Sequence, residues 1–336
     1  MKISHLYYCL FFLIISCINN DYSPELLKPN AKKELGEILF AMPQKYWKSE
    51  LGISIRNSFG QLNETTPLPY EKEYEVDFIV PNGVVNNIKI NNCIIFIDIE
   101  KFYSKNQNIQ VKRDLWAKGQ LIIELQFSSH EKAIEYFKKE SNQLKRKINQ
   151  FYNKIIQTKY STNNELNKYL TPELNLKFLA PNKMKLNKKG DNFWWFSKLS
   201  IKKDQNGPHE IQQGIFIYKY PYINQKQFSK EYQLRTRDSI CEVYVTGKNP
   251  ETYMEVRKDG LNKTSTNTSL INEEFQFKVA GSWRVVNDKM GGPFVSISKL
   301  NADKTFIITM DCYVYAPNFK KQNLLRELEA IVYSAK

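Results

Sequence analysis

Residues 93–99, CIIFIDI, form a continuous apolar run, which is typical of the central strand of a sheet. Other apolar or alternating segments predict its neighbours: GEILFAM at 36–42, YEVDFIVP at 74–81 and LIIELQF at 121–127. PQKYWKSELGISIRNSF at 43–59 repeats its apolar residues at helical spacing behind a proline, so we expect one helix there. QVKRDLWAKGQ at 110–120 predicts a short helix or turn.

A longer helix is expected after Ser129, which can cap it. Its apolar residues recur at steps of three and four: Ile134, Phe137, Leu144, Ile148, Phe151 and Ile155. Its other face carries Lys138, Lys139, Lys145, Arg146, Lys147 and Lys154. Such a helix either packs on a core with a solvated basic face or lies on a membrane surface. We favour the core.

The second half of the chain repeats this mixture of strands and helices. Strands are predicted at 193–200 (FWWFSKLS), 214–222 (GIFIYKYPY), 273–286 (EEFQFKVAGSWRVV), 289–300 (KMGGPFVSISKL, a turn and strand) and 304–317 (KTFIITMDCYVYAP). Helices are predicted at 226–241 and 320–335. The expected fold class is α+β: two α/β-sandwich-like halves, 30–185 and 186–336, with antiparallel or mixed sheets and helices packed on one face of each.

Residues 1–16 are typical of a signal peptide, with Lys2 before a short apolar run and the small Ser16 before the cut. The run is too short to span a bilayer. Ile14 to Cys17 resemble the lipobox of bacterial lipoproteins, in which the cysteine receives lipid and becomes the first mature residue. We therefore expect lipidation of Cys17 and a polar tether over 17–29; the alternative is a buried domain start with an ordinary thiol.

The net charge of +14 raises the question of nucleic-acid binding. Lysine greatly outnumbers arginine, whereas sequence-reading proteins depend on arginine for bidentate contacts. The abundance of lysine, asparagine and isoleucine is typical of an AT-rich genome. We therefore expect a solvated basic surface and no nucleic-acid partner, with attraction to anionic lipid or polymer at low salt as the alternative.

Signatures of catalysis or metal binding are absent from the sequence. His130 and His209 are the histidines beyond the leader, and HExxH, CxxC, GxSxG and P-loop motifs are missing, so no metal or cofactor is expected. Asp98 and Glu100 would share a face of a strand, and Glu273 and Glu274 are adjacent, but such carboxylates are more often solvated strand ends. The remaining cysteines, Cys93, Cys241 and Cys312, lie in apolar runs and are expected to be buried free thiols.

Two further features are interpreted from local chemistry. Gly291 and Gly292 precede Pro293 where the chain must turn, so we expect positive φ there. Trp194, Tyr218, Tyr220 and Tyr222 are the candidate ligand-binding residues, bordering a groove for a glycan or peptide. The alternative is that these aromatics are ordinary core and rim residues.

Several motifs resemble a family of bacterial envelope lipoproteins known as domain-of-unknown-function family 4837. They are FWWF, IYKYPY with TRDSI, GSWRV with MGGPFVS, VYAPNFKKQNLLRELEAIVYS, and, in the first half, YWKSELGISIRNSF and RDLWAKGQ. The resemblance implies a lipobox and no assigned activity.

Two functions remain open. The first is a membrane-anchored, non-catalytic binding or scaffold protein with a glycan or protein partner in the envelope. The second is a carboxylate-dependent hydrolase of cell-wall glycan. Because Ile18, not aspartate, follows the cysteine, we expect the outer membrane, facing the periplasm.

Overall fold

The computed structural model describes residues 28–336 except 104–107, 248, 250, 261 and 272–273. The leader, Cys17 and most of the expected tether therefore lie outside the described residues. Within them, no helix has the length and apolar character needed to cross a membrane.

The first half is built on a mixed five-stranded sheet in the order β4-β1-β5-β7-β6. β1, β4, β5 and β7 run parallel and β6 pairs antiparallel with β7. CIIFIDI is the central strand of this sheet, as predicted. The strands are β1 (Glu37–Ala41), β4 (Glu75–Ile79), β5 (Cys93–Ile99), β6 (Asn108–Arg113) and β7 (Leu121–Phe127), with a separate β2–β3 arm (Leu62–Asn63 and Glu71–Lys72).

Helices α2, α4 and α5 bury their apolar sides on one face of this sheet, where Phe40, Phe59 and Phe137 meet edge to face. A smaller cluster that includes Val84 and Ile88, near α3, covers the other face. The helices are α1 (Gln44–Trp47), α2 (Glu50–Phe59), α3 (Asn86–Lys89), α4 (His130–Lys139) and α5 (Ser141–Gln157), with the 3-10 turn η1 (Pro81–Gly83).

Both long helices predicted in this half are broken in two. Ser49 has extended backbone and its side chain accepts from Leu51 N, so it caps α2 and ends the run from α1. Glu140 separates α4 from α5. The buried side chains of α5 include Leu144, Ile148 and Phe151, so the apolar side of this helix is occupied by the core.

The prediction of a helix or turn at 110–120 was wrong for its first part, because β6 occupies Asn108–Arg113. β6 is an edge strand whose residues are mostly exposed, so it lacks the apolar run that marks the inner strands. Lys112 forms an ion pair with Glu124 of β7 at 2.6 Å, so polar side chains contribute to the pairing of this edge strand.

The second half is an antiparallel sheet in the order β11-β13-β14-β15-β10-β9-β8, with β12 paired to β13. Helices cover both of its faces, whereas one covered face was expected: α6 and α8 contribute to the cluster on one face and α7 to the cluster on the other. Its elements are α6 (Asn164–Leu174), β8 (Lys185–Gly190), β9 (Phe193–Asp204), β10 (Gly207–Pro221), η2 (Gln225–Phe228), α7 (Lys230–Tyr244), β11 (Met254–Val256), β12 (Ser265–Ile271), β13 (Glu274–Val285), β14 (Gly291–Leu300), β15 (Phe306–Tyr315) and α8 (Gln322–Val332).

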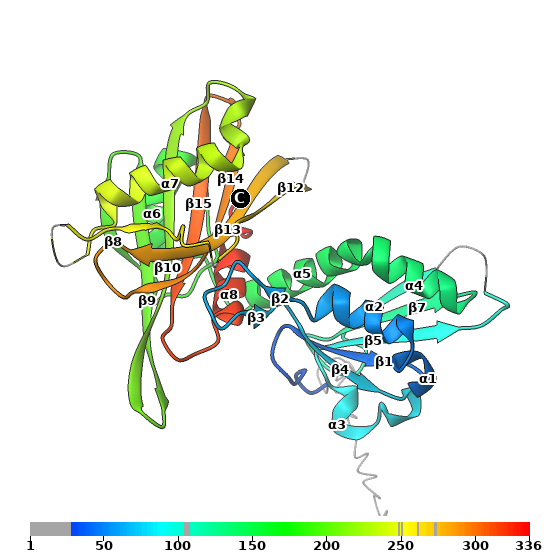
Figure 1. The fold of residues 1–336 in the computed structure, drawn as a ribbon. Helices are drawn as coiled ribbons and strands as arrows, with labels where there is room; N and C mark the ends of the chain where they lie inside the picture. The colour runs from blue at the N-terminus through cyan, green and yellow to red at the C-terminus, as the bar shows by residue number, and fades with distance from the viewer. Residues whose placement is uncertain (1–27, 104–107, 248, 250, 261, 272–273) are drawn as a thin grey trace, which may run out of the picture.

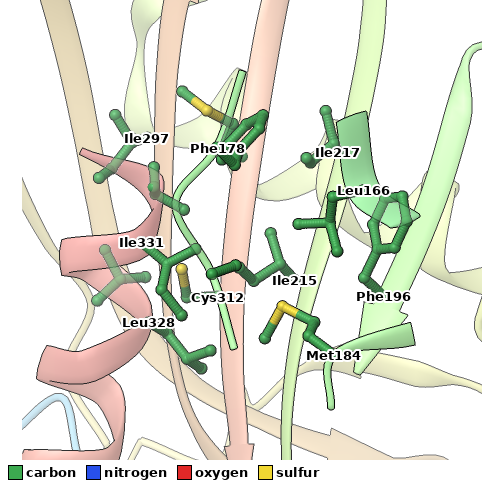
Figure 2. Packing of buried hydrophobic residues seen from close by; sticks show 14 of the residues in the cluster. Leu166, Phe178, Met184, Phe196, Ile215, Ile217, Ile297, Cys312, Leu328 and Ile331 are labelled. Atoms are coloured by element: carbon green, nitrogen blue, oxygen red, sulfur yellow. The ribbon is translucent and has the colours of Figure 1, made fainter. Parts of the chain in front are cut away.

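The cluster under α6 and α8 is the largest core of the molecule. Figure 2 shows Leu328 and Ile331 of α8 facing Ile215 and Cys312 of the sheet, with Phe178 and Leu166 packed beside them. Residues 164–184 thus pack with the second sheet, although the predicted division at residue 185 placed them in the first half. Cys312 here, Cys241 under α7 and Cys93 in the first half are buried free thiols, as expected.

A buried ion pair lies on the other face, under α7. Arg237 Nε donates to Asp311 Oδ2 at 2.8 Å, and its guanidinium lies 4.0 Å from the centre of the Phe294 ring. Burial alone would lower the pKa of Arg237, but the charge of Asp311 outweighs burial and raises it. Burial also raises the pKa of Asp311, against the lowering effect of the Arg237 charge and hydrogen bonds.

The prediction of positive φ at Gly291 and Gly292 was wrong: both are strand residues at the start of β14, and φ is positive at Asn287 in the preceding turn. Glycine is required at 292 for space instead. A Cβ built there would lie 1.8 Å from the Val314 carbonyl oxygen, closer than any real contact.

Candidate functional site

Helix α8 joins the two halves, and Figure 1 shows it between the second sheet and α5. Its buried Arg326 reaches into the first half, where it donates to the Leu35 carbonyl at 3.2 Å and the Glu73 carbonyl at 2.9 Å. At its other side, Gln157 of α5 donates to the Ala330 carbonyl at 2.8 Å.

The first half also supplies the N-terminal cap of α8. Backbone N–H groups of Lys321 and Gln322 donate to the Glu71 carboxylate at 2.8 Å, and Asn63 of the same arm donates to the Gln322 side chain. Lys321, the cap residue of the helix itself, makes no side-chain cap. A carboxylate at a helix N-terminus satisfies free N–H groups and the helix dipole, so the β2–β3 arm fixes where α8 begins.

Two clefts flank α8 at this junction. The first, which we call the basic cleft, has a volume of about 1070 Å³. Five exposed lysines line it, contributed by segments far apart in the chain: Lys33, Lys118, Lys159, Lys202 and Lys320. The carboxylates among its lining residues are Glu34 and Glu327, so the lining is net positive.

Three of these lysines have no carboxylate partner in the part of the chain that the structure describes: Lys118, Lys159 and Lys202. Lys202 instead lies over the Phe319 ring, 4.7 Å from its centre. Lys33 pairs with Glu37 at 3.3 Å and Lys320 with Glu75 at 2.9 Å. The cleft therefore keeps uncompensated positive charge.

Glu327 of α8, in contrast, is fully engaged. It accepts hydrogen bonds from Tyr160, from Gln213 at 2.7 Å and from Lys198 at 3.1 Å. Burial alone would raise its pKa, but the hydrogen bonds from Tyr160 and Gln213 and the charge of Lys198 outweigh burial and lower it. A general acid needs the opposite shift, so this lowered pKa does not favour that role for Glu327.

The start of the described chain forms one wall of the basic cleft. Asn30 and Ala31 line it, and Ala31 N donates to the Lys118 carbonyl at 2.8 Å while Lys118 N donates to the Pro29 carbonyl. Lys202 and Ile211, from the hairpin of β9 and β10, also line the cleft.

The second cleft, which we call the amide cleft, lies on the other side of α8 and has a volume of about 590 Å³. Amide and hydroxyl side chains are its largest group: Gln61, Asn63, Thr65, Asn149, Gln150, Asn153, Thr264, Ser265, Asn267, Ser269 and Gln322. Its three carboxylates each pair with a lysine: Glu64 with Lys263, Glu73 with Lys145 and Glu329 with Lys278.

Comparison with known proteins divides the chain in the linker after α5. Residues 31–161 match the domain of unknown function DUF8532, and residues 163–334, just over half of the chain, match the domain of unknown function DUF4837. The chain belongs to the DUF4837 family. The resemblance seen in the sequence of the second half is therefore confirmed, while the first half matches a separate domain.

Matches to better-known proteins are distant. No curated protein matches the chain. Among solved structures, the Saccharomyces cerevisiae Ran-binding protein Mog1p is 7% identical with a TM-score of 0.30, covering 48% of this chain and 89% of that one. A Bacteroides thetaiotaomicron VPI-5482 protein is 7% identical with a TM-score of 0.24, covering 48% of this chain and 44% of that one. Neither similarity is close enough to support an argument about function.

The aromatic residues predicted to border one groove are divided within the DUF4837 sheet. Trp194 is 1% exposed and packs in the cluster under α6 and α8, whereas Tyr218, also 1% exposed, packs on the α7 face. Tyr220 is half-buried and accepts from Gln233 of α7 at 2.8 Å, and Tyr222 packs against Phe228. Alternation along β9 and β10 sends Trp194 to the face opposite the tyrosines, so the four residues form no common groove.

The remaining candidates that the structure describes lie outside both clefts, and Glu273 lies outside the described residues. Asp98 and Glu100 are exposed at the end of β5, where Asp98 accepts from Tyr103. His130 lies 2.8 Å from the Ser49 hydroxyl and stacks on Tyr46, a structural position. His209 pairs with Asp204 at 2.9 Å. Among the described residues, no group of His, Cys, Asp and Glu is arranged to hold a metal ion.

Sequence reasoning missed both clefts. Their lining residues come from both halves, and no local motif links Lys33 or Lys118 to Lys159 and Lys202. The high lysine content indicated a basic surface but not its position, because composition does not tell which lysines lack a carboxylate partner.

Proposed function

We propose that this protein is a lipid-anchored, non-catalytic binding protein of the bacterial envelope, whose basic cleft takes a ligand bearing several phosphate or carboxylate groups. The observation that carries this proposal is the set of uncompensated lysines, Lys118, Lys159 and Lys202, around a cleft of about 1070 Å³. Clefts with one sign of charge concentrate ligands of the other sign. An anionic envelope glycan is the ligand class that we favour.

The anchor part of the proposal rests on the leader and on Cys17, which lie outside the described residues. Lipidated at Cys17, the protein would be exported and held in the outer membrane, facing the periplasm. The tether from Cys17 to Lys28 can span at most roughly 40 Å when fully extended. Because Asn30 and Ala31 line the basic cleft, an anchor a short distance before them in the chain would keep the cleft close to the bilayer.

Binding is favoured over hydrolysis by the state of the carboxylates. Glu327 is held by Lys198, Tyr160 and Gln213, and Glu34 accepts from Asn323 at 3.0 Å. A glycosidase needs two carboxyl groups facing one substrate, one of them with a raised pKa. Glu327, whose pKa is lowered, does not fit the acid role.

The anchor is tested by growing cells that express the full chain with radiolabelled palmitate and separating their membranes. We expect label on the wild-type protein and its recovery with the outer membrane. Cys17→Ser should abolish the label and leave the leader uncut. A Cys17→Ser protein that is cut normally and released would refute the anchor.

The cleft is tested by titration calorimetry with tripolyphosphate as the probe. The double variant Lys118→Glu with Lys159→Glu should weaken binding about 100-fold, since each reversal replaces attraction by repulsion in a shared cleft. Lys226→Glu, an exposed lysine in η2 away from the clefts, is the matched control and should bind like wild type. Equal losses in both variants, or no binding by wild type at low salt, would refute a specific anion site.

A further inference from the structure

Strand β12 forms an edge of the second sheet, and its outer side is open. Its residues pair with β13 in an unbroken antiparallel register, from Ser265 opposite Ala280 to Ile271 opposite Glu274. In the described part of the chain, no other segment forms a backbone hydrogen bond with residues 265–271. Every second residue of an antiparallel strand directs its N–H and C=O away from its partner, so β12 presents a row of free donors and acceptors.

The other outermost strands are protected against pairing with a further chain, whereas β12 is not. β8 (KLNKKG) is rich in lysine, and its register with β9 is irregular. β4 (EVDFI) and β6 (NIQVKR) carry charged residues, and β11 is three residues long. β12 (STNTSLI) has neither charge nor proline. Because charges, irregular register and short length are what keep a sheet edge from pairing, the edge of β12 is open to an added strand.

The amide cleft lies beside this edge. Ser265, Asn267, Ser269 and Ile271, the alternate residues of one face of β12, all line it. Leu270 lines it too, which indicates that the cleft meets the edge of the strand as well as that face. Figure 1 shows β12 above α5, whose residues line the same cleft. A strand added to β12 would therefore direct one of its two sets of side chains toward the cleft.

Polar side chains without partners line this part of the molecule. Gln150, Asn153 and Asn267 form no hydrogen bond within the described residues. The exposed Arg146 has neither a hydrogen bond nor an ion pair there, whereas the other basic side chains of the cleft are engaged. Arg146, Gln150 and Asn153 recur at helical spacing and lie on one side of α5. Together these groups suit acidic and hydroxyl side chains.

The other face of the same edge is apolar. Thr268 lies opposite Phe277 of β13, and Leu270 lies opposite Phe275. Leu270 is 75% exposed and Phe275 is 38% exposed, and the Phe275 ring meets Phe228 of η2 edge to face. Cross-strand neighbours on one face pack together, so an apolar side chain on an added strand would cover Leu270.

We infer that the free edge of β12 accepts an extended peptide segment of a partner protein, which adds a strand to the second sheet. Acidic or hydroxyl side chains of this segment alternate with apolar ones. The first set meets Arg146 and Gln150 in the amide cleft, and the second covers Leu270. A second copy of β12 complements the site less well, because STNTSLI has no acidic residue to meet Arg146. The inference depends neither on the anion site of the basic cleft nor on the lipid anchor.

The test screens the full-length protein against a library of heptapeptides. Each peptide has Val, Leu, Ile or Phe at alternate positions and Asp, Glu, Ser or Thr between them. Fluorescence anisotropy measures binding, and hydrogen exchange read by mass spectrometry locates it. We expect bound peptides to slow amide exchange in residues 265–271. A library in which no peptide binds, or bound peptides that leave exchange in 265–271 unchanged, would overturn the inference.

Two variants test the two parts of the site. Thr268→Lys should weaken binding about tenfold or more, because a lysine protects a sheet edge. Asn57→Lys, at an exposed position of α2, is its control for added charge. Arg146→Glu should weaken acidic peptides about tenfold, whereas Lys147→Glu, an exposed neighbour on α5 that does not line the cleft, should not. Wild-type affinity in Thr268→Lys or in Arg146→Glu would overturn the inference.

Two further outcomes concern the other occupants. The double variant Lys118→Glu with Lys159→Glu, altered in the basic cleft, should bind the peptides within about twofold of wild type, because salt screens distant charges. A large loss there would place the peptides in the basic cleft and overturn the inference. Slow exchange in 265–271 without peptide that increases with protein concentration would mean that a second copy covers the edge, which also overturns it.

Discussion

The two clefts beside α8 are built from the same helix and the same pair of halves, yet they treat charge differently. In the amide cleft, the carboxylates Glu64, Glu73 and Glu329 each neutralise a lysine. In the basic cleft, Glu327 forms its ion pair with Lys198. Lys118, Lys159 and Lys202 have no acidic partner in the described part of the chain. The lining of the amide cleft thus holds three carboxylates against four cationic side chains, whereas that of the basic cleft holds two against five, so the excess of positive charge is larger in the basic cleft.

This difference shows why net charge is a poor guide to binding. The excess of 14 positive charges is a property of the whole chain and does not say where a ligand would bind. The basic cleft is distinguished by how many of its lysines lack a carboxylate partner. A lysine already paired with a carboxylate attracts an anionic ligand weakly, whereas unpaired lysines around one cleft attract it together.

The largest expected effect is that of Arg326→Ala, which removes the support common to both clefts. Arg326 is buried and lies near the Tyr74 and Tyr152 rings, and it satisfies carbonyls of the first half. Its loss should cost about 3 kcal/mol, through lost packing and unsatisfied carbonyl groups. Urea unfolding measures this. Arg113→Ala, an exposed arginine of β6, is the control, and a similar small loss in both variants would contradict the role of Arg326.

Glu327→Gln should affect the basic cleft alone. It leaves the half-buried Lys198 without its partner, at a cost of about 1–2 kcal/mol, and removes a negative charge from the cleft, which should tighten tripolyphosphate binding. A decrease in affinity would show that Glu327 itself contacts the anion, contrary to a purely structural role.

Acid should act through the same residue. Because folding lowers the pKa of Glu327, its contribution to stability is present above its ordinary pKa of 4.5 and is lost as pH falls through the lowered value. Unfolding experiments at pH 7 and below pH 4.5 should therefore show a smaller acid loss in Glu327→Gln than in wild type. An equal loss of unfolding free energy on acidification in wild type and Glu327→Gln would contradict a lowered pKa of Glu327.

Lys278→Met tests whether the clefts are independent. The variant leaves Glu329 unpaired in the amide cleft and should cost about 1 kcal/mol. Tripolyphosphate binding in the basic cleft should be unchanged. A change in affinity would mean that α8 couples the two clefts.

The smallest effect on stability is expected for Lys159→Glu. Lys159 is exposed and forms no ion pair within the described chain, so the free energy of unfolding should stay within about 0.5 kcal/mol of wild type. The same variant should bind tripolyphosphate more weakly. Destabilisation by more than that would show that Lys159 serves the fold.

The sequence predicted the inner strands well because their signal is local. β5, β7 and β15 are apolar runs, and alternation along β10 placed Tyr218 and Tyr220 on one side correctly. The edge strand β6, the break at Ser49 and the close approach at Gly292 were missed, because pairing at an edge, a cap and a neighbouring backbone oxygen are not apolar patterns. The clefts could not be predicted, since they depend on how two halves meet.

The position of α8 along the chain has a consequence for biogenesis. In the chain, α8 follows the strands of both sheets. It nevertheless completes the core of the second half and packs on the first half, where Glu71 caps its N-terminus. During synthesis or export from the N-terminus, the second sheet would stay uncovered on that side until α8 emerges, and the halves could not lock together before then. Any chaperone that binds the unfolded protein would have to cover that apolar face of the second sheet until α8 has been synthesised or exported.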